Sequence, residues 1–213
     1  MTVNSYGFDP DRDEWSRDAS VRLLPAVLGS IMPYRKIVWA WESGIDRLDK
    51  YYAVDAIVQT PRRNIALAIR FRGYSYWKRF GDITIRYDSL QNLGKALEIQ
   101  KSIARFIFYG WLDTDPPVPG KEMVDWHLIW LQRLVDLHLR GVLPHKGPYP
   151  NTDGSSRLVA FTPELLRKHK LIYKSKTVID LAGEQYWQDI AASRSSHIAA
   201  KSLQMRLFDE VIQ

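Results

Sequence analysis

The sequence contains no cysteine among its 213 residues. Disulfide bonds, cysteine-based zinc sites and thiol nucleophiles are therefore excluded. No apolar run reaches the roughly 18 residues that a membrane-spanning helix needs. The N-terminal stretch is polar and acidic, without the basic-then-apolar order of a secretory signal peptide. Together these features predict a cytoplasmic protein that does not enter a membrane.

Several catalytic signatures are missing as well. Neither GxGxxG nor GxxxxGK occurs, which argues against a dinucleotide-binding oxidoreductase and a nucleotide kinase. There is no GxSxG elbow of the kind that carries a serine nucleophile. The five histidines are scattered and show no HExxH spacing. We therefore do not expect histidine-based metal chemistry or serine-hydrolase chemistry.

The composition is that of a folded domain, with 46% hydrophobic and 25% charged residues. Strand-like and helix-like segments alternate, which predicts an α/β fold with a central mixed β-sheet flanked by helices. We expect an N-terminal arm over 1–18, an α/β domain over 19–177 and a helical C-terminal extension over 178–213. The extension is amphipathic, and it could pack on the core, form a homodimer or bind a partner helix.

Two strands joined by a hairpin are the clearest local pattern. Residues 52–59 (YAVDAIVQ) and 65–72 (IALAIRFR) read as strands, and the TPRRN segment between them reads as a tight turn. In the second strand, Ala66, Ala68, Arg70 and Arg72 share one face because side chains alternate along a strand.

Other elements are predicted on either side of this hairpin. A helix is expected over 21–31, beginning at Ser20 or Pro25, and further strands over 82–87, 105–112 and 157–161. A helix is expected over 90–103, and the Thr162-Pro163-Glu164 sequence begins another. Residues 122–140 fit one helix, and nearly as well a strand through 127–131 followed by a shorter helix. Residues 147–156 read as a loop.

Basic and aromatic residues alternate between positions 60 and 90. The net charge is +6 and the isoelectric point is about 9.4. Cations can contact phosphates while rings stack on bases, so this pattern is typical of a nucleic-acid surface. The alternative is that the rings belong to the core and the cations are only solvated. The predicted phosphate contacts are Arg62, Arg63, Arg72, Lys78 and Arg79.

Carboxylates precede and enter the hairpin: Glu42, Asp46 and Asp55. Converging carboxylates are the ligands that Mg²⁺ takes in phosphodiester hydrolysis, and a nearby cation can stabilise the developing charge. On these residues the chain resembles the PD-(D/E)XK, or restriction-endonuclease-like, nuclease superfamily. That core has a helix, a hairpin carrying Asp and then (Glu/Asp/Gln)-x-Lys, a third strand, a helix and a fourth strand. The matching stretch runs from about residue 38 to residue 112.

The resemblance implies a nuclease-like core acting on DNA with Mg²⁺ or Mn²⁺. Asp55 and Glu42 would be catalytic, Arg70 would stand in the lysine position, and Asp46 would be a further metal ligand.

The second motif departs from the family, because Ala68 replaces the acid and Arg70 replaces the lysine. Ala68 cannot bind a metal, and arginine differs from lysine in geometry. The site could be inactive, leaving a DNA-binding or assembly factor, or it could have moved to Glu98 and Lys101. The motif could also correspond differently, and Asp55 could be a structural acid paired with Arg70 or Arg72.

Overall fold

The computed structural model describes residues 10–42, 48, 52–89, 102–150 and 156–176. Contacts divide the chain into residues 1–176 and 177–213, and every described residue belongs to the first unit. Asp46, residues 90–101 of the helix expected over 90–103, and the extension expected over 178–213 lie outside the described residues; residues 102 and 103 are not helical. A homodimer through that extension therefore stays a prediction.

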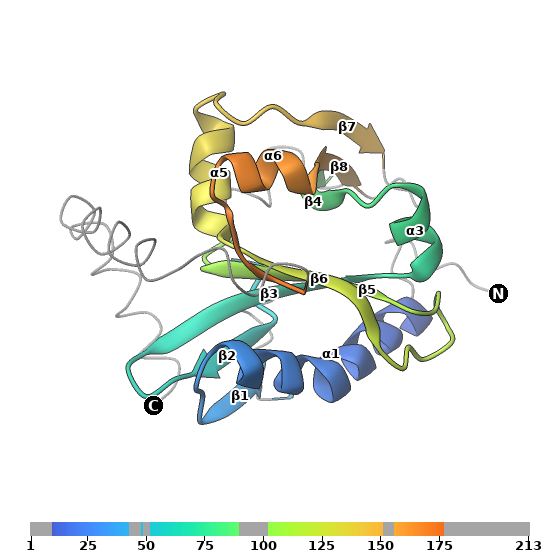
Figure 1. The fold of residues 1–213 in the computed structure, drawn as a ribbon, viewed down its shortest axis with the longest axis vertical. Coiled ribbons are helices and arrows are strands. Elements are labelled where there is room, and N and C mark those ends of the chain that lie inside the picture. Colours follow the sequence, from blue (N-terminus) through green and yellow to red (C-terminus); the bar gives the residue numbers. More distant parts are fainter. Residues whose placement is uncertain (1–9, 43–47, 49–51, 90–101, 151–155, 177–213) are drawn as a thin grey trace. The chain divides into compact units, whose positions relative to one another are not determined.

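The fold is α/β, with a mixed six-stranded sheet at its centre (Figure 1). The strand order is β1-β2-β3-β5-β6-β9; β3 and β5 are parallel, and all other neighbours are antiparallel. The bounds are β1 Lys36–Trp39, β2 Ala56–Gln59, β3 Asn64–Arg72, β5 Phe106–Leu112, β6 Met123–Ile129 and β9 Ile172–Ser175.

A second, three-stranded antiparallel sheet has the order β4-β8-β7. Its strands are β4 Ile83–Ser89, β8 Ser156–Phe161 and β7 Lys146–Pro150. The strand expected over 82–87 does form, but it pairs with β8 in this second sheet, and β5 takes the place beside β3. The expected loop over 147–156 was wrong in part, because 147–150 belong to β7.

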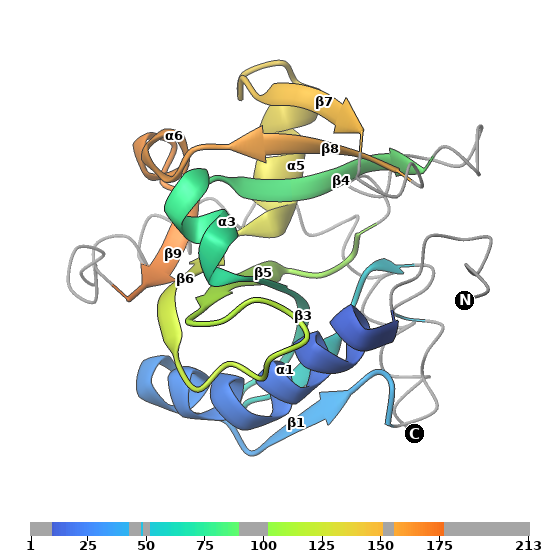
Figure 2. The same cartoon turned by 90° about the vertical axis from the view of Figure 1, so that its right-hand side faces the viewer.

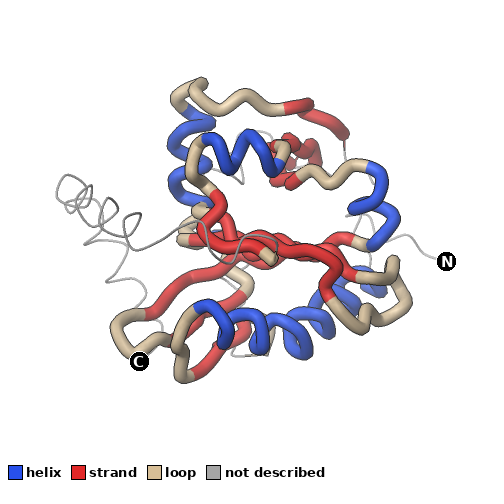
Figure 3. The backbone as a smooth tube through the Cα atoms, viewed as in Figure 1, coloured by secondary structure: helices blue, strands red, loops and turns tan. Residues whose placement is uncertain are grey.

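The two faces of the central sheet have different covers (Figures 1 and 2). α1 (Pro10–Ile31) lies along one face. The second sheet lies on the other side, together with α5 (Leu131–Leu139) and α6 (Pro163–Lys168). Figure 3 shows the central sheet as a continuous layer between these two covers. Since both faces are covered, every residue of β5 is buried.

α1 corrects the expected N-terminal arm. The helix begins at Pro10, so residues 10–18 form its first half. Proline suits the first helical position, and Asp11 and Asp13 in the first turn suit the positive end of the helix dipole. Trp15, which the arm assignment left exposed, is buried and donates its indole N–H to Val118 O at 2.8 Å. Burial of this face stabilises a segment that looks polar in sequence.

The hairpin that organises the site forms, although its first strand covers only 56–59 of the predicted 52–59. β2 and β3 are antiparallel, with Ala56 opposite Leu67 and Gln59 opposite Asn64. The Thr60 hydroxyl closes the turn by donating to Arg63 O at 2.7 Å and accepting from the Arg63 amide at 3.1 Å. Of the two alternatives for 122–140, the strand followed by a shorter helix is confirmed as β6 and α5. The Thr162 cap of α6 is also confirmed, since its side chain accepts from Leu165 N.

Candidate functional site

Asp55 lies at the entrance to β2, beside the segment that holds the degenerate motif. Its amide donates to Leu67 O at 2.9 Å, and its Oδ2 accepts from the Ile69 amide at 2.6 Å. Because Ala56 is opposite Leu67, this register places Asp55 beside Ala68. The Asp55 carboxylate therefore lies beside the Ala68-Ile69-Arg70 segment. Ala68 is 7% exposed and adds no oxygen to the site.

The other predicted metal ligands add little to Asp55. Glu42 is exposed in the turn after β1, two residues beyond Ala40, whose amide donates to Asp55 O at 2.9 Å. Within the described part of the chain, no three histidine, aspartate or glutamate side chains group to hold a metal ion. Mg²⁺ takes about six oxygen ligands, and one oxygen of Asp55 already accepts a backbone hydrogen bond. The described residues therefore do not fit a complete magnesium site.

The predicted phosphate contacts separate into three environments. Arg62 and Arg63 are exposed in the hairpin turn before β3. Lys78 and Arg79 are exposed on α3 (Tyr74–Arg79), after the other end of β3. Nine residues of strand span roughly 30 Å, so these two pairs cannot contact the same phosphate. Arg72, the fifth member, is buried at 8% exposure.

α3 exposes aromatic rings together with its cations. None of its six residues is buried, and Tyr74 and the following Phe80 are 39% and 54% exposed. The Arg79 guanidinium lies 5.0 Å from the centre of the Phe80 ring. The alternative in which these rings form the core is therefore wrong for Tyr74 and Phe80. Exposed rings beside cations are what a surface that stacks bases and contacts phosphates requires.

Arg72 is held between the two sheets by neutral groups. Its Nε donates to the Tyr109 hydroxyl at 3.2 Å, and its Nη2 donates to Thr84 Oγ1 at 2.8 Å. The Thr84 amide also donates to the Tyr109 hydroxyl, at 3.3 Å. With both acceptor positions used, Tyr109 donates its own proton to Thr84 Oγ1 at 3.0 Å. The cation thus joins β3, β5 and β4 but meets no described carboxylate.

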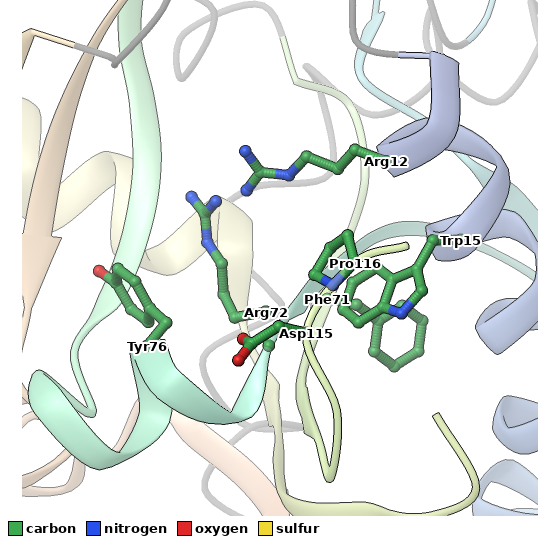
Figure 4. Close-up of a pocket in the computed structure, with 8 residues that line it drawn as sticks. Arg12, Trp15, Phe71, Arg72, Tyr76, Asp115 and Pro116 are labelled. Atoms are coloured by element: carbon green, nitrogen blue, oxygen red, sulfur yellow. The ribbon is translucent and has the colours of Figure 1, made fainter. Parts of the chain in front are cut away.

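A cavity of about 280 Å³ opens at the end of β3, in front of Arg72. Figure 4 shows the guanidinium groups of Arg72 and Arg12 pointing toward each other across it. The Tyr76 ring, 5.2 Å from the Arg72 guanidinium, forms one wall. Burial raises the pKa of the Tyr76 hydroxyl above its ordinary value of 10.0, so this group stays neutral. The remaining lining residues are Trp15, Phe71, Gly73, Asp115 and Pro116.

Asp115 packs so closely against the backbone of Gly73 that no side chain fits at position 73. Asp115 Oδ1 accepts from the Ser75 amide at 3.2 Å and from the Ser75 hydroxyl at 2.9 Å. A Cβ added to Gly73 would lie 1.9 Å from that same oxygen. Arg12 and Asp115 were not predicted as site residues from the sequence, because Arg12 lay in the expected arm and Asp115 in a loop.

The histidines add no second candidate. His127 is buried against Trp111, and burial lowers its pKa below the ordinary 6.5. His138 and His145 lie with their ring centres 4.8 Å apart; burial, and then the charge of His145, lowers the pKa of His138. The lowered pKa values keep the His127 and His138 rings neutral at pH 7. With two rings and no third ligand among the described residues, His138 and His145 do not form a metal site.

Comparison of the chain with protein-family models, with curated proteins and with solved structures gives no match in any of the three. In the described part of the chain, no helix is both long and apolar enough to cross a bilayer. The case for a function therefore depends on the geometry of α3, the β2–β3 hairpin and the cavity.

Proposed function

We propose that this protein is a cytoplasmic nucleic-acid-binding protein with a restriction-endonuclease-like fold. We propose DNA as its ligand. The binding proposal depends on the surface of α3. This helix exposes Tyr74, Lys78 and Arg79, and the exposed Phe80 follows it directly. Unpaired bases stack on exposed rings, and lysine and arginine contact the phosphates between them. An isolated exposed ring is ordinary on a protein surface, whereas rings and cations on one short helix are not.

The strand order supports the fold part of this proposal. β1, β2 and β3 form an antiparallel meander, and β5 joins it parallel to β3 after a crossover. The resemblance leads us to expect a hairpin, a third strand, a helix and a fourth strand, and the hairpin and β5 fit this order. The third strand differs, because β4 pairs with β8 in the second sheet.

We expect labelled single-stranded DNA to bind the full-length protein with an affinity that falls linearly in log salt concentration. Each phosphate contact on a single strand contributes about 0.7 to the slope. Replacing Lys78 and Arg79 together by glutamine should therefore reduce the slope by about 1.4. Phe80→Ala should weaken binding about tenfold at every salt concentration, because stacking does not release counterions.

The measurement is fluorescence anisotropy over a salt series, with circular dichroism to check folding. The matched control replaces two exposed cations by glutamine: Arg140, which follows α5, and Lys168 on α6. This control removes the same charge from another surface. Equal salt-dependence slopes for the two double variants would show that α3 is not part of the interface. An absence of salt-dependent binding by the unaltered chain would overturn the proposal.

Metal-dependent DNA cleavage is a second candidate, favoured by the register of Asp55 with Ala68-Ile69-Arg70. The described residues supply too few oxygens for the metal, so a functional site would need ligands from outside them, such as Asp46 or Glu98. Asp55→Asn is the informative variant, since its amide oxygen can still accept from the Ile69 amide while its charge is lost. Asp55→Ala removes both properties.

If Asp55 holds a metal, we expect Mg²⁺- or Mn²⁺-dependent cleavage of labelled DNA to disappear in both variants. If the role of Asp55 is only to accept the hydrogen bond from the Ile69 amide, neither variant should change DNA cleavage, and the two should differ only in the free energy of unfolding. Asp55→Ala would then lose about 1–3 kcal/mol by leaving the Ile69 amide without its acceptor, and Asp55→Asn would lose less. Absence of cleavage by the unaltered protein, with binding retained, would identify a nuclease-like scaffold without catalysis.

A further inference from the structure

Arg72 is a permanent cation that is enclosed by the protein and forms no ion pair with a carboxylate of the described residues. It is 8% exposed, and its contacts are Tyr109, Thr84 and the ring of Tyr76. Burial of an arginine is costly unless an anion accompanies it. None of the described carboxylates lies within ion-pair distance of Arg72. The hydrogen bonds occupy Nε and Nη2, which leaves Nη1 without a partner in the described part of the chain.

The cavity supplies room for the missing anion. It opens directly in front of Arg72, and Arg12 approaches from α1 on the other side (Figure 4). The two guanidinium groups come from segments that are 60 positions apart in sequence and face the same space. Planar guanidinium groups bind phosphate oxygens through paired, charge-assisted hydrogen bonds.

We infer that this cavity binds the terminal phosphate of a nucleic-acid strand, with Arg72 at its base and Arg12 at its rim. The inference rests on the proposed nucleic-acid function and names the part of the ligand that the cavity takes. A phosphate inside a continuous duplex is flanked by sugars on both sides and cannot reach a cation that is more than nine-tenths buried. A strand end carries its phosphate on one sugar and can insert it.

The other walls fit the rest of such a strand end. Tyr76 supplies a ring beside Arg72, and Trp15 and Phe71 add apolar surface to the lining. Asp115 also lines the cavity, with its carboxylate turned to Ser75. Its negative charge disfavours a second phosphate on that side, so the charges favour one phosphate next to the arginines and an uncharged sugar next to Asp115.

The test compares binding of four probes to the full-length protein. Three are the same single-stranded DNA with a 5′-phosphate, with a 3′-phosphate and with hydroxyl groups at both ends; the fourth is inorganic phosphate, followed by thermal shift. One phosphorylated strand should bind roughly 10- to 100-fold more tightly than the hydroxyl strand, which corresponds to charge-assisted hydrogen bonds. That preference should disappear in Arg72→Met and Arg12→Gln and persist in the control Arg140→Gln.

Arg72→Met keeps a long apolar side chain and removes a buried charge, so the free protein should stay folded. Arg12 is exposed in α1, and its variant carries the test if Arg72→Met does not fold. Equal binding of all three strands would overturn the terminal-phosphate inference while leaving the proposed function intact. If no DNA strand binds, the proposed function fails. A phosphate-induced thermal shift that requires Arg72 would in that case still show that the cavity binds an anion. Absence of both would overturn the inference as well.

Discussion

Replacing Tyr109 by phenylalanine is expected to lower the free energy of unfolding by about 3 kcal/mol. The change removes one oxygen atom from a ring that is fully buried between the two sheets. That oxygen accepts from Arg72 Nε and from the Thr84 amide. Each buried donor left without an acceptor costs about 1–3 kcal/mol, and more when the donor is charged. Two donors, one of them on a cation, lose their acceptor together.

Urea denaturation measures this effect, with an unchanged slope showing that the unfolding transition is the same. Tyr149→Phe is the matched control, since Tyr149 is 52% exposed on β7 and its hydroxyl meets water. The control should stay within about 0.5 kcal/mol of the unaltered chain. A loss below about 1 kcal/mol for Tyr109→Phe would mean that water replaces the hydroxyl and that the Arg72 network does not hold the sheets together.

The hairpin and its contents could be predicted from the sequence because the signals there are local. Thr60 to Asn64 carries turn residues between two alternating strands, and Asp55 falls beside Ala68 once the turn is placed. Strand alternation also predicted that Ala68, Arg70 and Arg72 share a face. The interpretation of that face was incomplete, because the strand pattern does not reveal what covers it.

The cover of that face comes from distant parts of the chain. β8 and β7 complete the second sheet more than 70 residues after β3. β7 was taken for a loop because it contains Pro148 and Pro150. Proline is tolerated at the edge of a sheet, and β7 is an edge strand of its sheet. Tertiary pairing thus produced a strand where the local residues indicated none.

The cavity could not be predicted for a related reason. Its cations come from Arg12 in α1 and Arg72 in β3, and its carboxylate comes from Asp115 in a loop. No local motif relates these three positions, since they meet only when α1 packs on the sheet. Arg72 was predicted to contact phosphate as one of five surface cations. Its burial between neutral partners separates it from the other four and makes it a candidate for one particular phosphate.

Replacing Gly73 by alanine is expected to lower the free energy of unfolding by about 2 kcal/mol and to disturb the cavity. The backbone of Gly73 is extended, with φ −74° and ψ 168°, which any residue can adopt. The requirement for glycine is therefore one of space. A Cβ would lie 1.9 Å from Asp115 Oδ1 and 3.0 Å from Asp115 Cα, so both the side chain and the backbone of that loop would have to move.

A double-mutant cycle with Asp115→Ala isolates this contact. Asp115→Ala alone should cost about 1 kcal/mol by removing the hydrogen bonds to Ser75. In that background Gly73→Ala should cost much less than in the unaltered chain, because the atoms that it meets most closely are gone. Gly29→Ala is the matched control: its Cβ has no neighbour closer than 3.8 Å, and alanine suits the interior of α1 better than glycine does. Equal costs for Gly73→Ala in both backgrounds would show that Asp115 does not press against Gly73, and the wall of the cavity that Asp115 forms would have to be assigned differently.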